Sequence, residues 1–186
     1  MKDYSFLLER PEHTFDEVAI NDALLRKRVL ITGAGGTIGS AIAHRVVRSP
    51  STFCGLVGHS ELPIFNLKNE LAPCGKIDTA IVDVGPEHVM RALIERWKPD
   101  IIFHAAAHKH VGLMESQPEQ AFANNTLATI SLARVAIQSQ SVRKFVFIST
   151  DKAVLPTSVM GASKRVAEVW LRKHATPFAT ICRFGN

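Results

Sequence analysis

The sequence predicts an α/β protein built on a doubly wound parallel sheet. Short apolar runs rich in β-branched residues alternate along the chain with longer segments whose apolar residues recur at helical spacing. The first of these runs ends in a glycine-rich turn, the point at which a strand of such a sheet passes into its helix. With 186 residues, 46% of them hydrophobic, the chain suits one domain with a substantial core.

The order of the elements follows from this alternation. Residues 1–26 form a lead-in segment that contains Pro11 and is expected to be partly helical around 15–25. Residues 27–186 are expected to form the doubly wound domain, because strands that alternate with helices pair in parallel. The β-branched and apolar runs predict strands at 28–33, 53–58, 76–84, 100–106, 144–150 and 177–184. Helical spacing between them, with Pro86 at a first helical position, predicts helices at 37–49, 62–72, 86–97, 118–138 and 158–175.

Composition excludes several classes of protein. The formal charge is +5, but Lys and Arg are scattered, so we expect affinity for small polyanions and no nucleic-acid partner. No apolar run approaches the roughly 20 residues of a membrane span, and the N-terminus is too charged for a signal peptide, which predicts a cytoplasmic protein. The three cysteines, Cys54, Cys74 and Cys182, form no Cys-x-x-Cys pair and predict no disulfide framework and no zinc site.

The glycine-rich turn predicts a dinucleotide-binding Rossmann fold. Gly33, Gly36 and Gly39 recur at spacings of three between a predicted strand and a predicted helix. Glycines there allow a tight turn, a close approach of pyrophosphate to the backbone, and packing of the helix against the strand. The phosphates would meet unpaired N–H groups at the helix N-terminus. We therefore expect NAD or NADP to contact the residues Gly33, Gly35, Gly36, Thr37, Ile38 and Gly39.

The residues that follow the next strands predict the rest of the cofactor site. An acid that binds the adenosine ribose is expected after the second strand, but Gly58 stands there, so the choice between NAD and NADP stays open. At and just beyond the ends of the strands at 53–58, 76–84 and 100–106 lie mostly small or polar residues, at the carboxyl edge of the sheet. We expect cofactor contacts there from His59, Ser60, Asp83, Val84, Ala105, Ala106 and Ala107.

A second polar cluster is expected where the fifth strand ends. Thr150, Asp151 and Lys152 follow that strand, and Met160 and Lys164 lie four residues apart on one face of the next helix. Short-chain dehydrogenases carry a tyrosine and a lysine at this spacing. Met160 occupies the tyrosine position and cannot transfer a proton, whereas Lys164 can still bind the nicotinamide ribose. Deprotonation of a sugar hydroxyl would then fall to Thr150, with Asp151 and Lys152 as acid and base.

Three histidines in the run HAAAHKH raise the question of a metal. His104, His108 and His110 lie across a strand end and a loop, and no acidic residue joins them before Glu115. Such spacing does not by itself bring three rings together, so no metal site is predicted.

The chain resembles the CapD-like polysaccharide biosynthesis family, which belongs to the extended short-chain dehydrogenase/reductases. The resemblance covers residues 27 to 186 and rests on the motifs ITGAGGTIGS, GHSELPIFNLKNEL, KPDIIFHAAAHKHVGLME, FVFISTDKAV, PTSVMGASKRVAE and RFGN. It implies a nucleotide-sugar 4,6-dehydratase acting on UDP-N-acetylglucosamine, with Thr150 and Lys164 serving oxidation at C4 and Asp151 with Lys152 serving elimination. It also implies that Asn125 lines the active site beside the cofactor and that Lys109, His110 and Asn186 contact the substrate.

The resemblance has departures and alternatives. His108 stands where the family usually has tyrosine, Gly58 where it often has an acid, and Ser158 where asparagine is common. The sequence ends two residues after the sixth strand, whereas the family continues through a substrate domain, so a fragment or a truncated form is expected. A nucleotide-sugar 4-epimerase and a non-catalytic dinucleotide-binding remnant stay open as alternatives. The family also implies that a homo-oligomer can form through neighbouring Rossmann domains.

Overall fold

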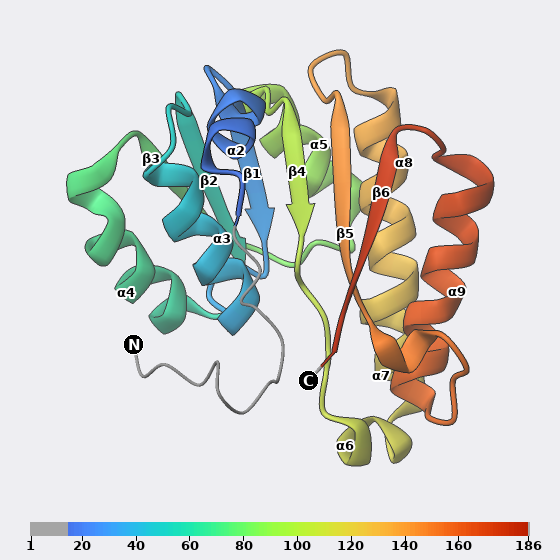
Figure 1. Ribbon diagram of the computed structural model, residues 1–186. Helices are drawn as coiled ribbons and strands as arrows, with labels where there is room; N and C mark the ends of the chain where they lie inside the picture. The colour runs from blue at the N-terminus through green and yellow to red at the C-terminus, as the bar shows by residue number, and fades with distance from the viewer. Residues whose placement is uncertain (1–14, 186) are drawn as a thin grey trace, which may run out of the picture.

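A computed structural model describes residues 15–185 and shows one six-stranded parallel sheet (Figure 1). The strand order is β3-β2-β1-β4-β5-β6, the order of a dinucleotide-binding Rossmann fold. The strands are β1 (Arg28–Thr32), β2 (Phe53–Gly58), β3 (Ile77–Ile81), β4 (Ile101–His104), β5 (Lys144–Thr150) and β6 (Ala179–Phe184). The doubly wound fold class predicted from the alternating pattern is confirmed.

The strand order places a topological switch point at the centre of the sheet. β1 pairs with β2 on one side and with β4 on the other, with Thr32 opposite Val57 and His104. The connections leaving β1 and β4 therefore diverge to opposite faces, which opens a crevice at the carboxyl ends of these strands. In Figure 1 the strand arrows point toward this edge.

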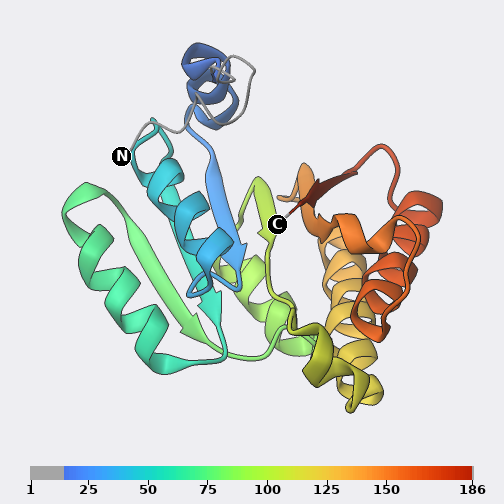
Figure 2. The ribbon, with the colours of Figure 1, turned by 60° about the horizontal axis from the view of Figure 1, so that its bottom comes forward.

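Helices cover both faces of the sheet (Figures 1 and 2). One apolar core joins the sheet to α3 (Thr37–Val47), α4 (Glu61–Leu71) and the end of α2 (Glu17–Leu24). The other joins it to α5 (Glu87–Trp97), α8 (Ala128–Gln138) and α9 (Val159–His174). The fully buried strand residues Leu30, Ile31, Phe145 and Phe147 explain why the strands are apolar runs without alternation: both of their faces are covered.

The element boundaries differ from the predicted ones mainly at the carboxyl edge. β3 ends at Ile81 instead of residue 84, and β4 ends at His104 instead of residue 106. Val82 still donates its N–H to the Gly58 carbonyl, but the chain then leaves the sheet as a loop. The residues beyond these strand ends are thus free to line a site. The predicted helical lead-in is present as α2, and residues 1–14 lie outside the described part of the chain.

The long helix predicted at 118–138 is interrupted. α7 (Pro118–Phe122) passes into a π-helical turn, η2 (Ala123–Leu127), and then into α8. Single π turns inside helices occur frequently at functional sites because they redirect one side chain. The sequence pattern also missed a short helix, α6 (Val111–Glu115), in the segment after β4.

No helix within residues 15–185 is long and apolar enough to cross a membrane.

Candidate functional site

The glycine turn brings backbone groups together as the sequence predicted. Gly33 has a φ of 65°, and a Cβ there would lie 2.5 Å from the backbone nitrogen of Ala106. A Cβ on Gly39 would overlap the Gly33 carbonyl oxygen and lie 2.8 Å from the Ala34 Cα. Only glycine fits at these two positions, since one needs left-handed backbone and the other faces backbone atoms that cannot rotate away.

The first turn of α3 supplies free backbone donors above this turn. Gly36 is the N-cap residue and no side chain caps the helix there. Unpaired N–H groups at a helix N-terminus, together with the helix dipole, favour a phosphate group. The geometry fits a pyrophosphate, because the glycines also leave room for it beside the backbone.

A pocket of about 670 Å³ begins at the glycine turn and extends along the carboxyl ends of β1, β4 and β5. Its lining contains most of the residues predicted for the cofactor, the catalytic cluster and the substrate. These are Gly33, Gly36, Thr37, Ile38, Gly39, Ala105, Ala107, Lys109, His110, Thr150, Lys152, Met160 and Lys164. Residues far apart in the sequence therefore meet at the crevice that the strand order creates.

Thr150, Asp151 and Lys152 form a closed hydrogen-bonded cluster on a single turn, η3 (Asp151–Ala153). The Thr150 hydroxyl donates to Asp151 Oδ1 at 2.8 Å, and the Lys152 ammonium lies 3.2 Å from the same oxygen. The hydrogen bonds from Thr150 and then Lys152 hold the pKa of Asp151 below its ordinary value. Asp151 is therefore a carboxylate that already accepts a hydrogen bond from the hydroxyl of its neighbour.

Lys164 reaches the pocket from α9 and is almost completely buried. Its Nζ donates to the Ile148 carbonyl at 2.6 Å and lies 4.0 Å from the centroid of the Phe147 ring. Burial lowers the pKa of Lys164 to about 7, against the opposing effect of Glu168. Met160, one turn earlier, is 5% exposed and packs with Met114 and Ala121 while it also lines the pocket. The position of the usual tyrosine is thus apolar and partly core.

His104 is separated from the other histidines of its run. Its two ring nitrogens lie 2.6 Å from the Thr32 hydroxyl and 2.8 Å from the Thr129 hydroxyl, and it is completely buried. Burial, and then the charge of Lys164, lower the pKa of His104 to about 3, so the ring is neutral. Within residues 15–185, no three His, Cys, Asp or Glu side chains lie together in a way that could hold a metal ion.

Asn125 holds the loop that follows β4 instead of lining the pocket. It lies in the π turn, is completely buried, accepts from the His108 N–H at 2.8 Å and donates to the His108 carbonyl at 2.9 Å. It also donates to the Ser163 hydroxyl at 3.1 Å. Asn125 thereby fixes the backbone that carries His108, Lys109 and His110 into the pocket.

The remaining predicted residues lie outside the pocket lining. His59 and Ser60 are exposed at the end of β2, and Asp83 is exposed in the loop after β3, beside the buried Val84. They lie at the same edge of the sheet, on the β2–β3 side of the glycine turn. The others are Gly35, Ala106 and Asp151; Asn186 lies outside the described residues.

Several residues that shape the site escaped the sequence pattern. A Cβ on Gly161 would overlap the Lys152 carbonyl oxygen, so this glycine lets α9 approach η3. Ser158 is the N-cap of α9 and accepts from the Gly161 N–H at 3.1 Å, while Glu115 accepts from the Val159 N–H at 2.7 Å. Serine is a preferred residue at a helix N-cap, but the contact from Glu115 depends on the tertiary fold.

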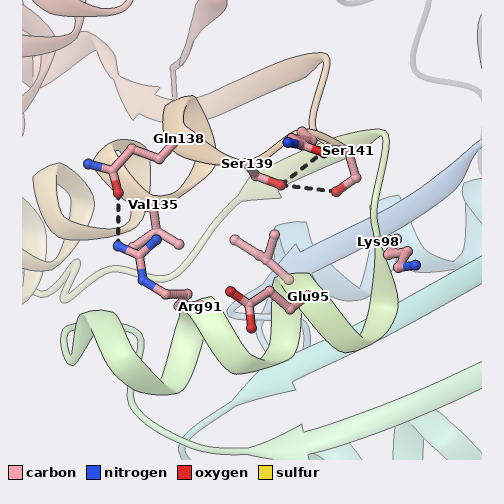
Figure 3. A pocket seen from close by; sticks show the side chains of 9 residues that line it. Arg91, Glu95, Lys98, Val135, Gln138, Ser139 and Ser141 are labelled. Carbon is pink, nitrogen blue, oxygen red and sulfur yellow. Dashed lines mark hydrogen bonds between the residues drawn. The ribbon is translucent and has the colours of Figure 1, made fainter.

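A second hollow, of about 530 Å³, lies at the opposite edge of the sheet (Figure 3). Its walls come from the ends of α5 and α8 and from the loop that precedes β5. Arg91 donates to Gln138 across it at 2.8 Å, and Glu95, Lys98, Ser139 and Ser141 lie around its rim. None of the predicted site residues contributes to it, so the carboxyl edge is the candidate site.

The strand order, the glycine turn and the pocket at the switch point together define a Rossmann-fold domain of the dinucleotide-binding type. Residues 29–186 match the family described as polysaccharide biosynthesis protein, and the chain belongs to that family. The resemblance predicted from the motifs is therefore confirmed.

Two curated relatives match nearly the whole chain. The probable polysaccharide biosynthesis protein EpsC of Bacillus subtilis is 41% identical over 97% of this chain and 31% of its own length. The capsular polysaccharide biosynthesis protein CapD of Staphylococcus aureus is 40% identical over 97% of this chain and 31% of its own length. The chain thus spans about a third of these relatives.

Solved structures share the fold. Pen from Bacillus thuringiensis superposes with a TM-score of 0.79 at 32% identity, over 88% of this chain and 53% of Pen. The UDP-Glc/GlcNAc 4-epimerase of Campylobacter jejuni superposes with a TM-score of 0.73 at 25% identity, over 86% of this chain and 53% of its own. A dTDP-glucose 4,6-dehydratase of Streptomyces venezuelae, DesIV, solved with NAD bound, has a TM-score of 0.74 at 18% identity and covers 84% of this chain and 55% of its own, which shows the fold alone.

Proposed function

We propose that the chain holds NAD or NADP across the carboxyl ends of its sheet. The support is the glycine turn, where a Cβ at Gly33 or Gly39 would collide with backbone atoms, followed by the uncapped start of α3. The pyrophosphate would bind at Gly36, Thr37 and Ile38, and the nicotinamide half would extend along the pocket toward Lys164. The adenosine half would lie toward His59, Ser60, Asp83 and Val84, with Ala105, Ala106 and Ala107 along its path.

We further propose that this domain belongs to a nucleotide-sugar 4,6-dehydratase that acts on a substrate of the UDP-N-acetylglucosamine type. The observation that carries the proposal is the Thr150-Asp151-Lys152 cluster, of which Thr150 and Lys152 line the same pocket as Lys164 and the apolar Met160. An elimination needs an acid and a base beside the group that carries out the oxidation, and this cluster offers both within one turn.

The chain has three cysteines without a disulfide framework, which fits the proposed cytoplasmic location.

The bound nicotinamide would supply the redox chemistry, taking a hydride from C4 of the sugar and returning it at C6 after water has left. The Thr150 hydroxyl would accept the C4 hydroxyl proton as it passes its own proton to Asp151, along the 2.8 Å hydrogen bond already present. Asp151, protonated in that step, would give its proton to the C6 hydroxyl as it leaves as water, and Lys152, as the free amine, would take the proton from C5. Lys164 would hold the nicotinamide ribose, while Met160 keeps its surroundings free of a competing proton donor. Lys109 and His110 would face the sugar nucleotide, with Asn186 as a further proposed contact.

A nucleotide-sugar 4-epimerase is the second candidate, favoured by the solved epimerase that shares the fold at 25% identity. An epimerase also oxidises C4 but loses no water. Met160 is 5% exposed and lies where such enzymes have their proton-transferring tyrosine, which favours the dehydratase.

The test is incubation of the chain with UDP-N-acetylglucosamine and either NAD or NADP, followed by mass spectrometry. A product lighter by one water supports the dehydratase, and an isomer of unchanged mass supports the epimerase. Lys152→Ala is expected to abolish the loss of water while NADH binding persists, and the exposed Lys68→Ala serves as the matched control. Failure of the chain to bind either dinucleotide would refute the proposal at its first step.

A further inference from the structure

A buried ionic cluster lies just behind the pocket. Glu168 on α9 is completely buried, and both of its carboxylate oxygens are bound by charged or polar groups. Arg183 donates to Oε1 at 2.9 Å and to Oε2 at 2.5 Å, and Ser149 donates to Oε1 at 2.7 Å. Arg165 adds a longer contact of 3.4 Å. Burial alone would raise the pKa of Glu168, but these hydrogen bonds hold that pKa below its ordinary value.

The cluster ties three elements together at one level of the sheet. Ser149 on β5 lies directly opposite Arg183 on β6 in the strand register. Glu168 reaches both from α9, so one carboxylate joins the helix to two neighbouring strands. A two-pronged arginine–carboxylate contact fixes orientation as well as distance.

The same helix makes hydrogen bonds to two consecutive residues at the end of β5. Lys164 donates to the Ile148 carbonyl, and Glu168, one turn later, accepts from the Ser149 hydroxyl. Residues four apart on a helix lie on one face, so both hydrogen bonds come from the same face of α9. The next residue along the strand is Thr150, which begins the catalytic cluster proposed above. The position of that cluster therefore depends on these two contacts.

We propose that Glu168 is a positioning residue that, with Arg183 as its counter-charge, fixes the end of β5 and holds Lys164 in its ammonium form. The inference rests on the proposed function in one respect, namely that Lys164 must be charged to bind the cofactor ribose. A buried ammonium is unfavourable without a nearby negative charge. Glu168 supplies that charge, and Arg183 balances it.

The other charged groups around Lys164 determine in which direction each substitution shifts its protonation. After loss of the Glu168 charge, the carboxylate left among these groups is Asp151, which is already paired with Lys152. Loss of the Arg183 charge would leave Glu168 less neutralised and would favour the ammonium. The titratable and charged groups are His104 on β4, Asp151 and Lys152 on η3, Arg165 and Glu168 on α9, and Arg183 on β6.

The test measures the titration of Lys164 directly in the unliganded chain, by NMR of ¹³C-labelled lysine, with Lys164→Arg to assign the signal. Glu168→Gln keeps the shape of the side chain and is expected to lower the ratio of charged to neutral Lys164 about tenfold at a given pH. Arg183→Gln is expected to raise that ratio, and the double variant is expected to return close to the wild-type ratio. Glu87→Gln, at an exposed pair with Arg91 on α5, is the matched control and should leave the ratio unchanged.

Opposite shifts of the two single variants support the inference, since a purely structural role would not give opposite signs. Shifts of the same sign, or no shift in either variant, would overturn it. If Glu168→Gln does not fold, the Arg183→Gln titration decides alone: a raised ratio supports the inference, and a lowered or unchanged ratio overturns it. A second measurement is the pH dependence of NADH and NADPH binding, which Glu168→Gln should move to lower pH. A wild-type chain that binds neither dinucleotide at any pH refutes the proposed function, while the Lys164 titration still judges the inference.

Discussion

Replacement of Gly39 by alanine tests the close packing on which the glycine turn depends. Gly39 lies in the first turns of α3, and an added Cβ would overlap the Gly33 carbonyl oxygen and lie 2.8 Å from the Ala34 Cα. Both neighbours are backbone atoms, so the clash is relieved only if the helix moves away from the strand. Overpacking of this kind costs about 1–3 kcal/mol, and the higher helix propensity of alanine offsets about 1 kcal/mol of it.

We therefore expect Gly39→Ala to lower the free energy of unfolding by up to about 2 kcal/mol and to lower Tm by up to roughly 8 °C. The displaced helix would also carry the phosphate-binding N–H groups out of place, so NADH affinity should fall at least about tenfold, or about 1.4 kcal/mol. Urea unfolding followed by circular dichroism measures the first effect, and NADH fluorescence measures the second.

The matched control is Gly112→Ala in α6, because a Cβ there meets nothing within 4 Å. That change should leave NADH binding intact and should stabilise the helix by up to about 1 kcal/mol. The reasoning would be refuted by a Gly39→Ala chain that is as stable as the wild type and binds NADH equally well.

Three further outcomes are expected. The pKa of His104 is about 3 in the folded chain, below the ordinary value of 6.5, so His104 contributes stability that is present above pH 6.5 and is lost as the pH falls toward 3. His104→Gln should reduce the difference in unfolding free energy between pH 4 and pH 7, measured by urea titration. An unchanged difference would count against this role of His104. Ser158→Ala removes the N-cap of α9 and should cost about 1 kcal/mol of unfolding free energy, measured against the exposed Ser116→Ala. Asn125→Ala frees the backbone of His108 and should weaken substrate binding more than NADH binding, as calorimetry with each ligand would show; equal losses would mean that Asn125 acts on the cofactor.

The Glu168 cluster also bears on how the site tolerates Met160. With methionine at position 160, the direct partners of Lys164 within residues 15–185 are the Ile148 carbonyl and the Phe147 ring. Its charge state then depends on more distant groups, of which Glu168 is the one that favours the ammonium. This dependence is the physical reason for treating the cluster as part of the site.

The sequence by itself determined the fold and the carboxyl-edge location of the site. Apolar runs covered on both faces, such as those containing Leu30 and Phe147, predicted a parallel sheet, and Gly33 and Gly39 predicted the turn between β1 and α3. These features are local: a strand period, a helix period and a backbone conformation that only glycine adopts easily are legible in short windows of sequence.

The tertiary structure alone decided how the residues of the site depend on one another. It placed Asn125 in a π turn where it fixes the His108 backbone, enclosed His104 between Thr32 and Thr129, and joined Glu168 to Ser149 and Arg183. Each of these contacts joins side chains from different elements, and their pairing depends on strand order and register. No periodicity along the chain records that information, because it arises only when the sheet has brought its carboxyl ends together.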